Sequence, residues 1–480
     1  MVEIDLISPA DIDEFQADLP PATPAHSLGR LISYTLPWPA TSLLTFLQQA
    51  PHAPRIYWEQ DPNDLTFAGY GLAATLTASG PDRFQVIQQQ AARLFAHAIQ
   101  AADDTPPHVG PRLFGGFAFR SGAAAHGIWS AFPAAHFILP RYQLTRLGDQ
   151  AWLTINHCLD MGEQADQIAA SLRADVQMLR LALDLVDEQE VGALADVSRP
   201  ALSLKVDYPM DAATWEQLIT LTTNRIRAGE LDKVVLARVC RARASRLIEP
   251  IEVLTWLEQN YAECYRFLIE PIPGHAFFGA TPELLADVKG TSLRTAALAG
   301  SLKRGQTPAE DARLGQALLA DPKDRQEHAF VVDAIQKNLR PLVSDLQAPS
   351  QPNLYRLSNI QHLQTPIQGQ LSQPVGVLPV VDALHPTPAM GGTPRELALH
   401  LIAEEEPFSR GWYASPVGWI DAAGNGLFAV AIRSAVSVGH QACLFAGVGI
   451  VADSDPAKEW QETNLKFRPM LEALGGTVEA

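Results

Sequence analysis

Two pairs of carboxylates have the spacing that places both members of a pair on one face of a helix. Asp324 and Glu327 are three residues apart, and so are Glu459 and Glu462. Lys466 would share the second face, because residues three or four apart are neighbours on a helix surface. Two such helices packed together would form an oxygen-rich site for Mg²⁺, which binds one or two carboxylates, water and an anionic ligand. Solvated helix faces are the simpler alternative.

A lysine and a glutamate in apolar surroundings are candidates for acid–base chemistry. Lys233 opens the apolar run in DKVVLAR (232–238), and lysine is almost never fully buried unless it is paired or functional. A lysine that burial keeps neutral can act as a general base. Glu283 lies in FFGATPELL, where apolar neighbours would raise the pKa of the carboxyl group and favour a general acid. A lysine that extends to solvent and an exposed turn glutamate are the alternatives.

Three glycine-containing stretches suit close contact between the backbone and a ligand. They are TAALAGS (295–301), LHPTPAMGGTP (384–394) and FAGVGIV (445–451). Gly300, Gly447 and Gly449 would let the backbone approach a ligand and offer N–H groups to an anion. Tight turns and strand crossings explain the same glycines without a ligand. The GVG sequence is not a dinucleotide fingerprint, because Ala452 stands where the third glycine would be required.

Helix start signals place the carboxylate pairs on helices. Thr307 begins a capping box (TPAE), and DPKD at 321–324 begins a second helix that carries the first pair. Asp455 and Pro456 open a last helix that carries the second pair. Asp211 is a further N-cap, and its helix ends near Gly229, just before a strand that begins with KVVLAR.

The order of the predicted elements indicates the fold class. Strands alternate with helices without a regular βαβ rhythm, and further helices are predicted over about 83–101 and 163–186. We therefore expect an α+β fold with large, mainly antiparallel sheets flanked by helices. Charge, proline and glycine without periodicity at 187–210 indicate an internal joint. It separates an N-terminal α+β region, 1–200, from a region, 201–480, that carries the candidate chemistry.

Composition excludes several classes of protein. The chain has 480 residues, with 36 basic and 53 acidic side chains, a net charge of −17 and no basic block, which argues against nucleic acid or an anionic membrane as partner. Four widely spaced cysteines indicate neither a zinc site nor a disulfide framework. The sequence shows no secretory signal and no apolar stretch of 18 residues, so we expect a cytoplasmic protein.

Nine ordered stretches together resemble the chorismate-utilising enzymes. This family comprises isochorismate synthases, salicylate synthases and the large subunits of anthranilate and aminodeoxychorismate synthases. The matching stretches lie between residue 231 and about 475, with a weaker match, RLFGGFAF and FILPRY, in the N-terminal half. They are KVVLAR, FFGATPELL, TAALAGS, DPKDRQEH, LHPTPAMGG, RGWYASPVGWID, FAVAIRS, AGVGIV and SDPAKEWQET.

The resemblance implies a role for each candidate residue. Lys233 matches the general base that activates water for attack at C2 of chorismate, and Glu283 matches the general acid that protonates the departing C4 hydroxyl. The resemblance also implies a single chorismate-binding architecture, in which residues 1–200 are the variable part and 201–480 the catalytic region. The implied Mg²⁺ ligands are Glu327 and Glu462, and Asp324 and Glu459 would support these ligands or contact the ion through water. The implied substrate contacts are Gly300, His362, Ala389, Tyr413, Arg433, Gly447, Gly449 and Lys466.

Departures from the family's patterns select among its members. The lysine nucleophile of aminodeoxychorismate synthases, in a PIKGT stretch, is missing from residues 297–301, and anthranilate synthases typically have glutamine where this chain has Lys233. We therefore expect no glutamine amidotransferase subunit. The small Ala389 resembles isochorismate synthases, isomerases of the menaquinone or siderophore type. Salicylate synthase and a catalytically silent chorismate-binding protein remain alternatives, and we expect a monomer or weak homodimer.

Overall fold

A computed structural model describes residues 29–476, apart from 62–63, 103–104, 107, 123–124, 160–162, 164, 185–202 and 359. The predicted boundary at residue 200 lies outside the described residues. None of the helices in the described ranges combines the length and the apolar character that a membrane span requires.

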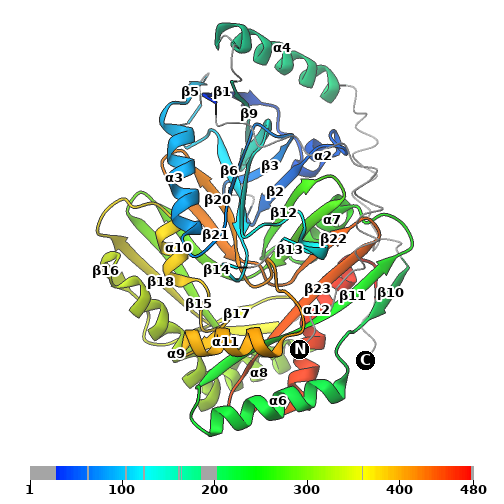
Figure 1. The fold of residues 1–480 in the computed structure, drawn as a ribbon, viewed down its shortest axis with the longest axis vertical. Coiled ribbons are helices and arrows are strands. Elements are labelled where there is room, and N and C mark those ends of the chain that lie inside the picture. The colour runs from blue at the N-terminus through cyan, green and yellow to red at the C-terminus, as the bar shows by residue number, and fades with distance from the viewer. Residues whose placement is uncertain are drawn as a thin grey trace.

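Two large sheets form the body of the protein (Figure 1). Within the described residues they contain 13 and 10 strands. The strand pairs in them are antiparallel, except that β1 pairs with β5 in parallel. The α+β fold with large, mainly antiparallel sheets is therefore confirmed.

The first sheet has the order β10 (Leu204–Asp207), β11 (Lys233–Ala244), β23 (Gln441–Ile450), β22 (Ser434–Val438), β13 (His275–Thr281), β12 (Tyr265–Ile272), β2 (Arg55–Glu59), β3 (Thr66–Tyr70), β8 (Tyr142–Leu147), β9 (Gln150–Cys158), β1 (Leu31–Trp38) and β5 (Ile99–Ala102), with β19 (Gly392–Thr393) paired to β11. The second has the order β16 (Val343–Gln347), β18 (Ile360–Leu371), β15 (Ser292–Lys303), β14 (Leu284–Lys289), β21 (Gly426–Val430), β20 (Pro416–Asp421), β6 (Arg112–Phe117), β7 (Ala135–Leu139) and β4 (Ala74–Ala78), with β17 (Asn353–Arg356) paired to β18.

Both sheets combine strands from the two halves of the chain. In the first sheet β2 pairs with β12, and in the second β6 pairs with β20. The N-terminal strands therefore extend sheets that the C-terminal half begins.

The predicted helix starts are confirmed. The side chain of Asp211 accepts a hydrogen bond from the Thr214 amide at the start of α6 (Ala212–Arg227). Helices α8 (Pro308–Ala320), α9 (Pro322–Leu339) and α12 (Pro456–Ala473) likewise begin at side chains that cap backbone N–H groups. Helix α4 (Ala165–Asp184) also lies where the sequence predicts one.

One helix ends earlier than the sequence predicts. Helix α3 (Arg83–Ala96) was expected to reach about Ala101, but residues 99–102 form β5 and pair with β1. The prediction was wrong there because pairing with a strand more than sixty residues away outweighs local helix propensity.

Helices cover the sheets and carry the candidate carboxylates. Helices α8 and α9 pack on β15, while α12 packs on β23 and β11 and also contacts α6 (Figure 1). Shorter helices are α2 (Leu43–Gln48), α7 (Pro250–Asn260), α10 (Leu378–Leu384) and α11 (Arg395–Glu405), with a 3₁₀ turn at Gly127–Trp129. The two predicted carboxylate pairs thus lie on α9 and α12, which pack against neighbouring parts of the core.

Candidate active site

Two of the points at which the chain crosses from one sheet to the other lie next to each other. Pro282 and Glu283 connect β13 to β14, and residues 431–433 connect β21 to β22. The Val430 amide donates to the Glu283 carbonyl at 2.9 Å, and the Ala280 amide donates to the Arg433 carbonyl at 3.1 Å. These bonds hold Glu283 and Arg433 next to each other where the sheets meet.

A cavity of about 180 Å³ lies at these crossings. Every residue that the sequence predicts for catalysis, substrate binding or the metal lines it. They are Lys233, Glu283, Gly300, Asp324, Glu327, His362, Ala389, Tyr413, Arg433, Gly447, Gly449, Glu459, Glu462 and Lys466. The fold therefore brings fourteen residues from distant parts of the chain into one pocket.

Lys233 is a buried lysine with a carboxylate partner. It is the first residue of β11 and is 8% exposed, and its Nζ donates to Glu327 Oε1 on α9 at 2.6 Å. Gly449 on the neighbouring strand β23 leaves room for it, because a Cβ there would lie 2.8 Å from Lys233 Cε and 3.2 Å from Nζ. The lysine side chain thus occupies space that is open because Gly449 has no side chain.

Replacing Gly449 by alanine is expected to lower catalytic activity up to about 100-fold, because the added methyl group would push Lys233 out of position. The protein should still fold, since the displaced atoms belong to the end of a flexible side chain. Gly122→Ala is the control, because a Cβ there meets no atom within 4 Å. Steady-state kinetics of both variants would test this, and unchanged kcat in Gly449→Ala would contradict it.

Glu283 lies in surroundings that favour its protonated form. The residue is 5% exposed. Burial raises the pKa of Glu283 to about 8, and the nearby charges of Arg433, Lys233 and Lys466 limit the rise. The carboxyl group therefore holds a proton at neutral pH and can donate it.

Four carboxylates of α9 and α12 face the same pocket. Burial raises the pKa of Asp324 to about 6 and that of Glu459 to about 7, and neighbouring acids add to both shifts. Burial also acts to raise the pKa of Glu462, but Lys466, together with Arg433 and Lys233, outweighs it and holds that pKa below the ordinary value. The raised pKa values of Asp324 and Glu459 thus reflect burial together with neighbouring carboxylates, a combination that a bound cation would relieve.

The same carboxylates fit a cation by their chemistry. In the described part of the chain, no three His, Cys, Asp or Glu side chains converge closely enough to hold a metal ion as they stand. Two lysines instead take up carboxylate oxygens: Lys233 binds Glu327, and Lys466 Nζ lies 2.6 Å from Glu462 Oε1. Carboxylate oxygens in a partly buried pocket are the ligands that Mg²⁺ prefers.

Arg433 and Tyr413 line the pocket with polar groups that suit an anion rather than a cation. Arg433 is 9% exposed and has a φ of 51°, a left-handed conformation that is uncommon for residues other than glycine. Burial lowers its pKa. The ring of Tyr413 stacks on Phe445 with centroids 5.1 Å apart. A strained, buried arginine at a crossing is suited to a fixed, bidentate contact with a carboxylate.

His362 is a neutral polar group with one free nitrogen. Its Nδ1 lies 2.7 Å from Ser301 Oγ, while Nε2 is buried without a partner. Burial lowers the pKa of His362 to about 3, assisted by Arg433 and Lys466. The imidazole can therefore exchange a hydrogen bond with a ligand but carries no charge near neutral pH.

Comparison with known proteins identifies the family. Residues 21–475 match the family model described as chorismate binding enzyme. The chain belongs to this family. The resemblance predicted from nine sequence stretches is thereby confirmed.

Several relatives of this chain are named isochorismate synthases. Isochorismate synthase MenF of Bacillus subtilis is 36% identical over 427 residues, which cover 88% of each chain. The salicylate biosynthesis isochorismate synthase of Pseudomonas aeruginosa is 39% identical over 423 residues, which cover 88% of this chain and 85% of that protein. The solved structure of the menaquinone-specific isochorismate synthase MenF from Escherichia coli has a TM-score of 0.75, is 28% identical, and covers 97% of this chain and 99% of its own.

Sequence reasoning on this chorismate binding enzyme missed several residues that line the pocket. Lys323 lies inside the DPKD stretch and Arg410 opens RGWYASPVGWID, so both were within quoted motifs. Ser454 lines the pocket as well and bonds to the Val451 amide at 3.2 Å. Glu406 and Arg410 are four residues apart but lie beyond the end of α11 at Glu405, so no helical pattern indicates that they pair.

Proposed function

We propose that the protein is a magnesium-dependent isochorismate synthase, an isomerase that converts chorismate to isochorismate. The observation that carries the proposal is the meeting of Lys233, Glu283 and four carboxylates in one pocket. The names and identities of the relatives support the same reaction.

In the proposed reaction, Lys233 is the base and Glu283 is the acid. Lys233 in its neutral amine form accepts a proton from water as the water oxygen bonds to C2 of chorismate. The two ring double bonds shift, the bond between C4 and its hydroxyl oxygen breaks, and Glu283 donates the proton that lets this oxygen leave as water. One water enters and one leaves, so the product is an isomer. Only the neutral amine has a lone pair, so Lys233 must give up a proton before this step, while an N–H group of the amine can still donate to Glu327.

The remaining lining residues would hold the substrate and the metal. Glu327 and Glu462 would bind Mg²⁺ directly, and Asp324 and Glu459 would support these ligands or contact the ion through water. When bound, the ion would supply positive charge for the ring carboxylate of chorismate. Arg433 and Tyr413 would hold the enolpyruvyl carboxylate, and the other contacts would come from Gly300, His362, Ala389, Gly447, Gly449 and Lys466.

Water rather than ammonia is the nucleophile in this proposal. Lys233 is the residue type that activates water, and residues 297–301 lack a lysine nucleophile. We therefore propose that the enzyme needs no glutamine amidotransferase subunit. We also propose that it is cytoplasmic and works as a monomer or weak homodimer.

The test is incubation of purified protein with chorismate and Mg²⁺, with and without ammonia, followed by chromatography of the products. We expect isochorismate without pyruvate, unchanged by ammonia. Salicylate with an equal amount of pyruvate would assign the protein to the salicylate synthases. Anthranilate would overturn the role of Lys233, and unchanged chorismate would indicate a silent chorismate-binding protein.

Replacing Glu462 by glutamine is expected to raise the Mg²⁺ concentration needed for half-maximal activity by about tenfold or more, because one anionic metal ligand is lost. Calorimetric titration with Mg²⁺ should show the same weakening without substrate turnover. Glu472→Gln on the same helix is the control, since Glu472 pairs with Arg468. Equal Mg²⁺ affinity in wild-type protein and Glu462→Gln would refute the assignment.

A further inference from the structure

Glu406 and Arg410 form a buried, two-point ion pair beside the active-site pocket. Arg410 Nε donates to Glu406 Oε2 at 2.8 Å and Nη2 donates to Oε1 at 2.5 Å. The side chains are 2% and 1% exposed. Burying two charges removes them from water, so such a pair is weak evidence for a stabilising role and invites another explanation.

The remaining hydrogen-bonding groups of the pair bind backbone groups of two segments that form walls of the active-site pocket. Arg410 Nη2 donates to the Val235 carbonyl at 2.7 Å, and Nη1 donates to the Met390 carbonyl at 3.1 Å. Glu406 Oε1 accepts from the Ala237 amide at 2.8 Å. Strand β11 and the 384–394 stretch are therefore fastened to one pair of side chains.

These backbone contacts lie next to residues of the proposed chemistry. Val235 is two residues from Lys233 on β11, so both side chains project from the same face, and both line the pocket. Met390 follows Ala389, which also lines the pocket. The Val235 amide in turn donates to the Gly391 carbonyl at 2.9 Å. A shift of Arg410 would thus move the strand of the base relative to the opposite wall.

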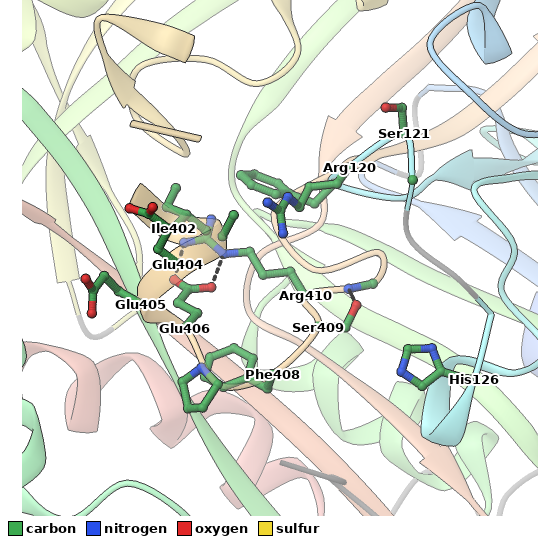
Figure 2. Close-up of a pocket in the computed structure, with 15 residues that line it drawn as sticks. Arg120, Ser121, His126, Ile402, Glu404, Glu405, Glu406, Phe408, Ser409 and Arg410 are labelled. Atoms are coloured by element: carbon green, nitrogen blue, oxygen red, sulfur yellow. Dashed lines mark hydrogen bonds and ion pairs between the residues drawn. The ribbon is translucent and has the colours of Figure 1, made fainter. Parts of the chain in front are cut away.

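Arg410 also borders a second, larger cavity. A cavity of about 1050 Å³ lies on its other side, lined by the end of α11, the loop that follows it and residues near Phe119 (Figure 2). The guanidinium carbon of Arg410 lies 4.4 Å from the centre of the Phe119 ring. Because Arg410 lines both cavities, it forms part of the partition between them.

We propose that the Glu406–Arg410 pair is a positioning unit that sets Lys233 and the Ala389 wall at their working separation. This inference rests on the proposed function, in which Lys233 is the base. The planar guanidinium provides donors in a fixed fork, which a lysine ammonium cannot reproduce. The pair acts through the backbone of β11 and of the 384–394 stretch and does not itself take part in proton transfer.

A matched pair elsewhere in the protein separates positioning from general stability. Arg55 binds Glu270 through Nε at 2.5 Å and Nη2 at 3.2 Å, with exposures of 2% and 0%. That pair lies on β2 and β12, and neither residue is among those that line the pocket. Arg410→Lys and Arg55→Lys therefore make the same chemical change in similarly buried pairs.

We expect Arg410→Lys to lower kcat up to about 100-fold with a smaller change in KM, because a displaced base reduces the rate of the chemical step. Arg55→Lys should keep kcat, although both variants should lose thermal stability. Equal kcat in the two folded variants would overturn the positioning role. Wild-type protein that leaves chorismate unchanged would overturn the proposed function, and the positioning role with it.

Chemical rescue provides a second test that does not depend on Arg410→Lys folding. Methylguanidinium at low millimolar concentration should enter the larger cavity and restore part of the kcat of Arg410→Ala. The same compound should leave kcat of wild-type protein and Arg55→Ala unchanged. Absence of rescue in a folded, chorismate-binding Arg410→Ala protein would count against the positioning role.

Discussion

Replacing Lys233 by alanine is expected to abolish turnover of chorismate while leaving chorismate binding in place. The variant lacks the proposed proton acceptor, and general base catalysis typically contributes about 10²- to 10⁴-fold to a rate. Binding should persist because Arg433, Tyr413 and the remaining pocket residues are unchanged. Chromatographic assays at saturating chorismate would give kcat, and calorimetric titration would give the dissociation constant.

The control for this experiment is Lys458→Ala. Lys458 is an exposed lysine in the first turn of α12, close in sequence to Glu459 but not among the residues that line the pocket. Its removal changes net charge as Lys233→Ala does, so activity of the control should match that of wild-type protein. Turnover by Lys233→Ala within a factor of ten of the control would refute the role of the base.

Local signals made parts of the fold predictable. The starts of α6, α8, α9 and α12 follow from side chains that cap N–H groups a few residues away, so the sequence alone contains the information. The order of strands is different, because β2 pairs with β12 and Arg55 lies opposite Glu270, more than two hundred residues later. Pairings of that range depend on the whole core.

The site was predictable as a set of residues but not as an arrangement. The family resemblance that the short motifs carry named fourteen of the residues that line the pocket, although it missed Lys323, Arg410 and Ser454. The partner of Lys233 could not be predicted, because Glu327 approaches from another element 94 residues away. The role of Arg410 was hidden for a further reason, because its contacts at Val235 and Met390 are backbone carbonyls, which no side-chain pattern reveals.

Replacing Glu283 by glutamine is expected to remove activity and, at the same time, to stabilise the fold at neutral and alkaline pH. Glutamine keeps the shape of the side chain but cannot donate the proton that the C4 hydroxyl requires. In wild-type protein kcat/KM should fall as pH rises through about 8, the pKa to which burial raises Glu283 in the free enzyme. A pH–rate profile with no loss of kcat/KM up to pH 9 would contradict Glu283 as the acid.

The stability effect follows from the same raised pKa. The unfolded chain ionises Glu283 near its ordinary pKa of 4.5, whereas the folded protein retains the proton until about pH 8. Between these values the unfolded state loses a proton that the folded state keeps, so this group makes the wild-type free energy of unfolding fall as pH rises, by at most about 1.4 kcal/mol per pH unit. Glu283→Gln lacks this loss, so its advantage in Tm should be absent near pH 4 and largest at pH 8 and above. The buried carboxyl group that destabilises the fold is therefore the same group that the reaction needs as an acid. If Glu283→Gln loses both the activity and the Glu283-dependent fall in the free energy of unfolding with pH, one side chain accounts for both properties.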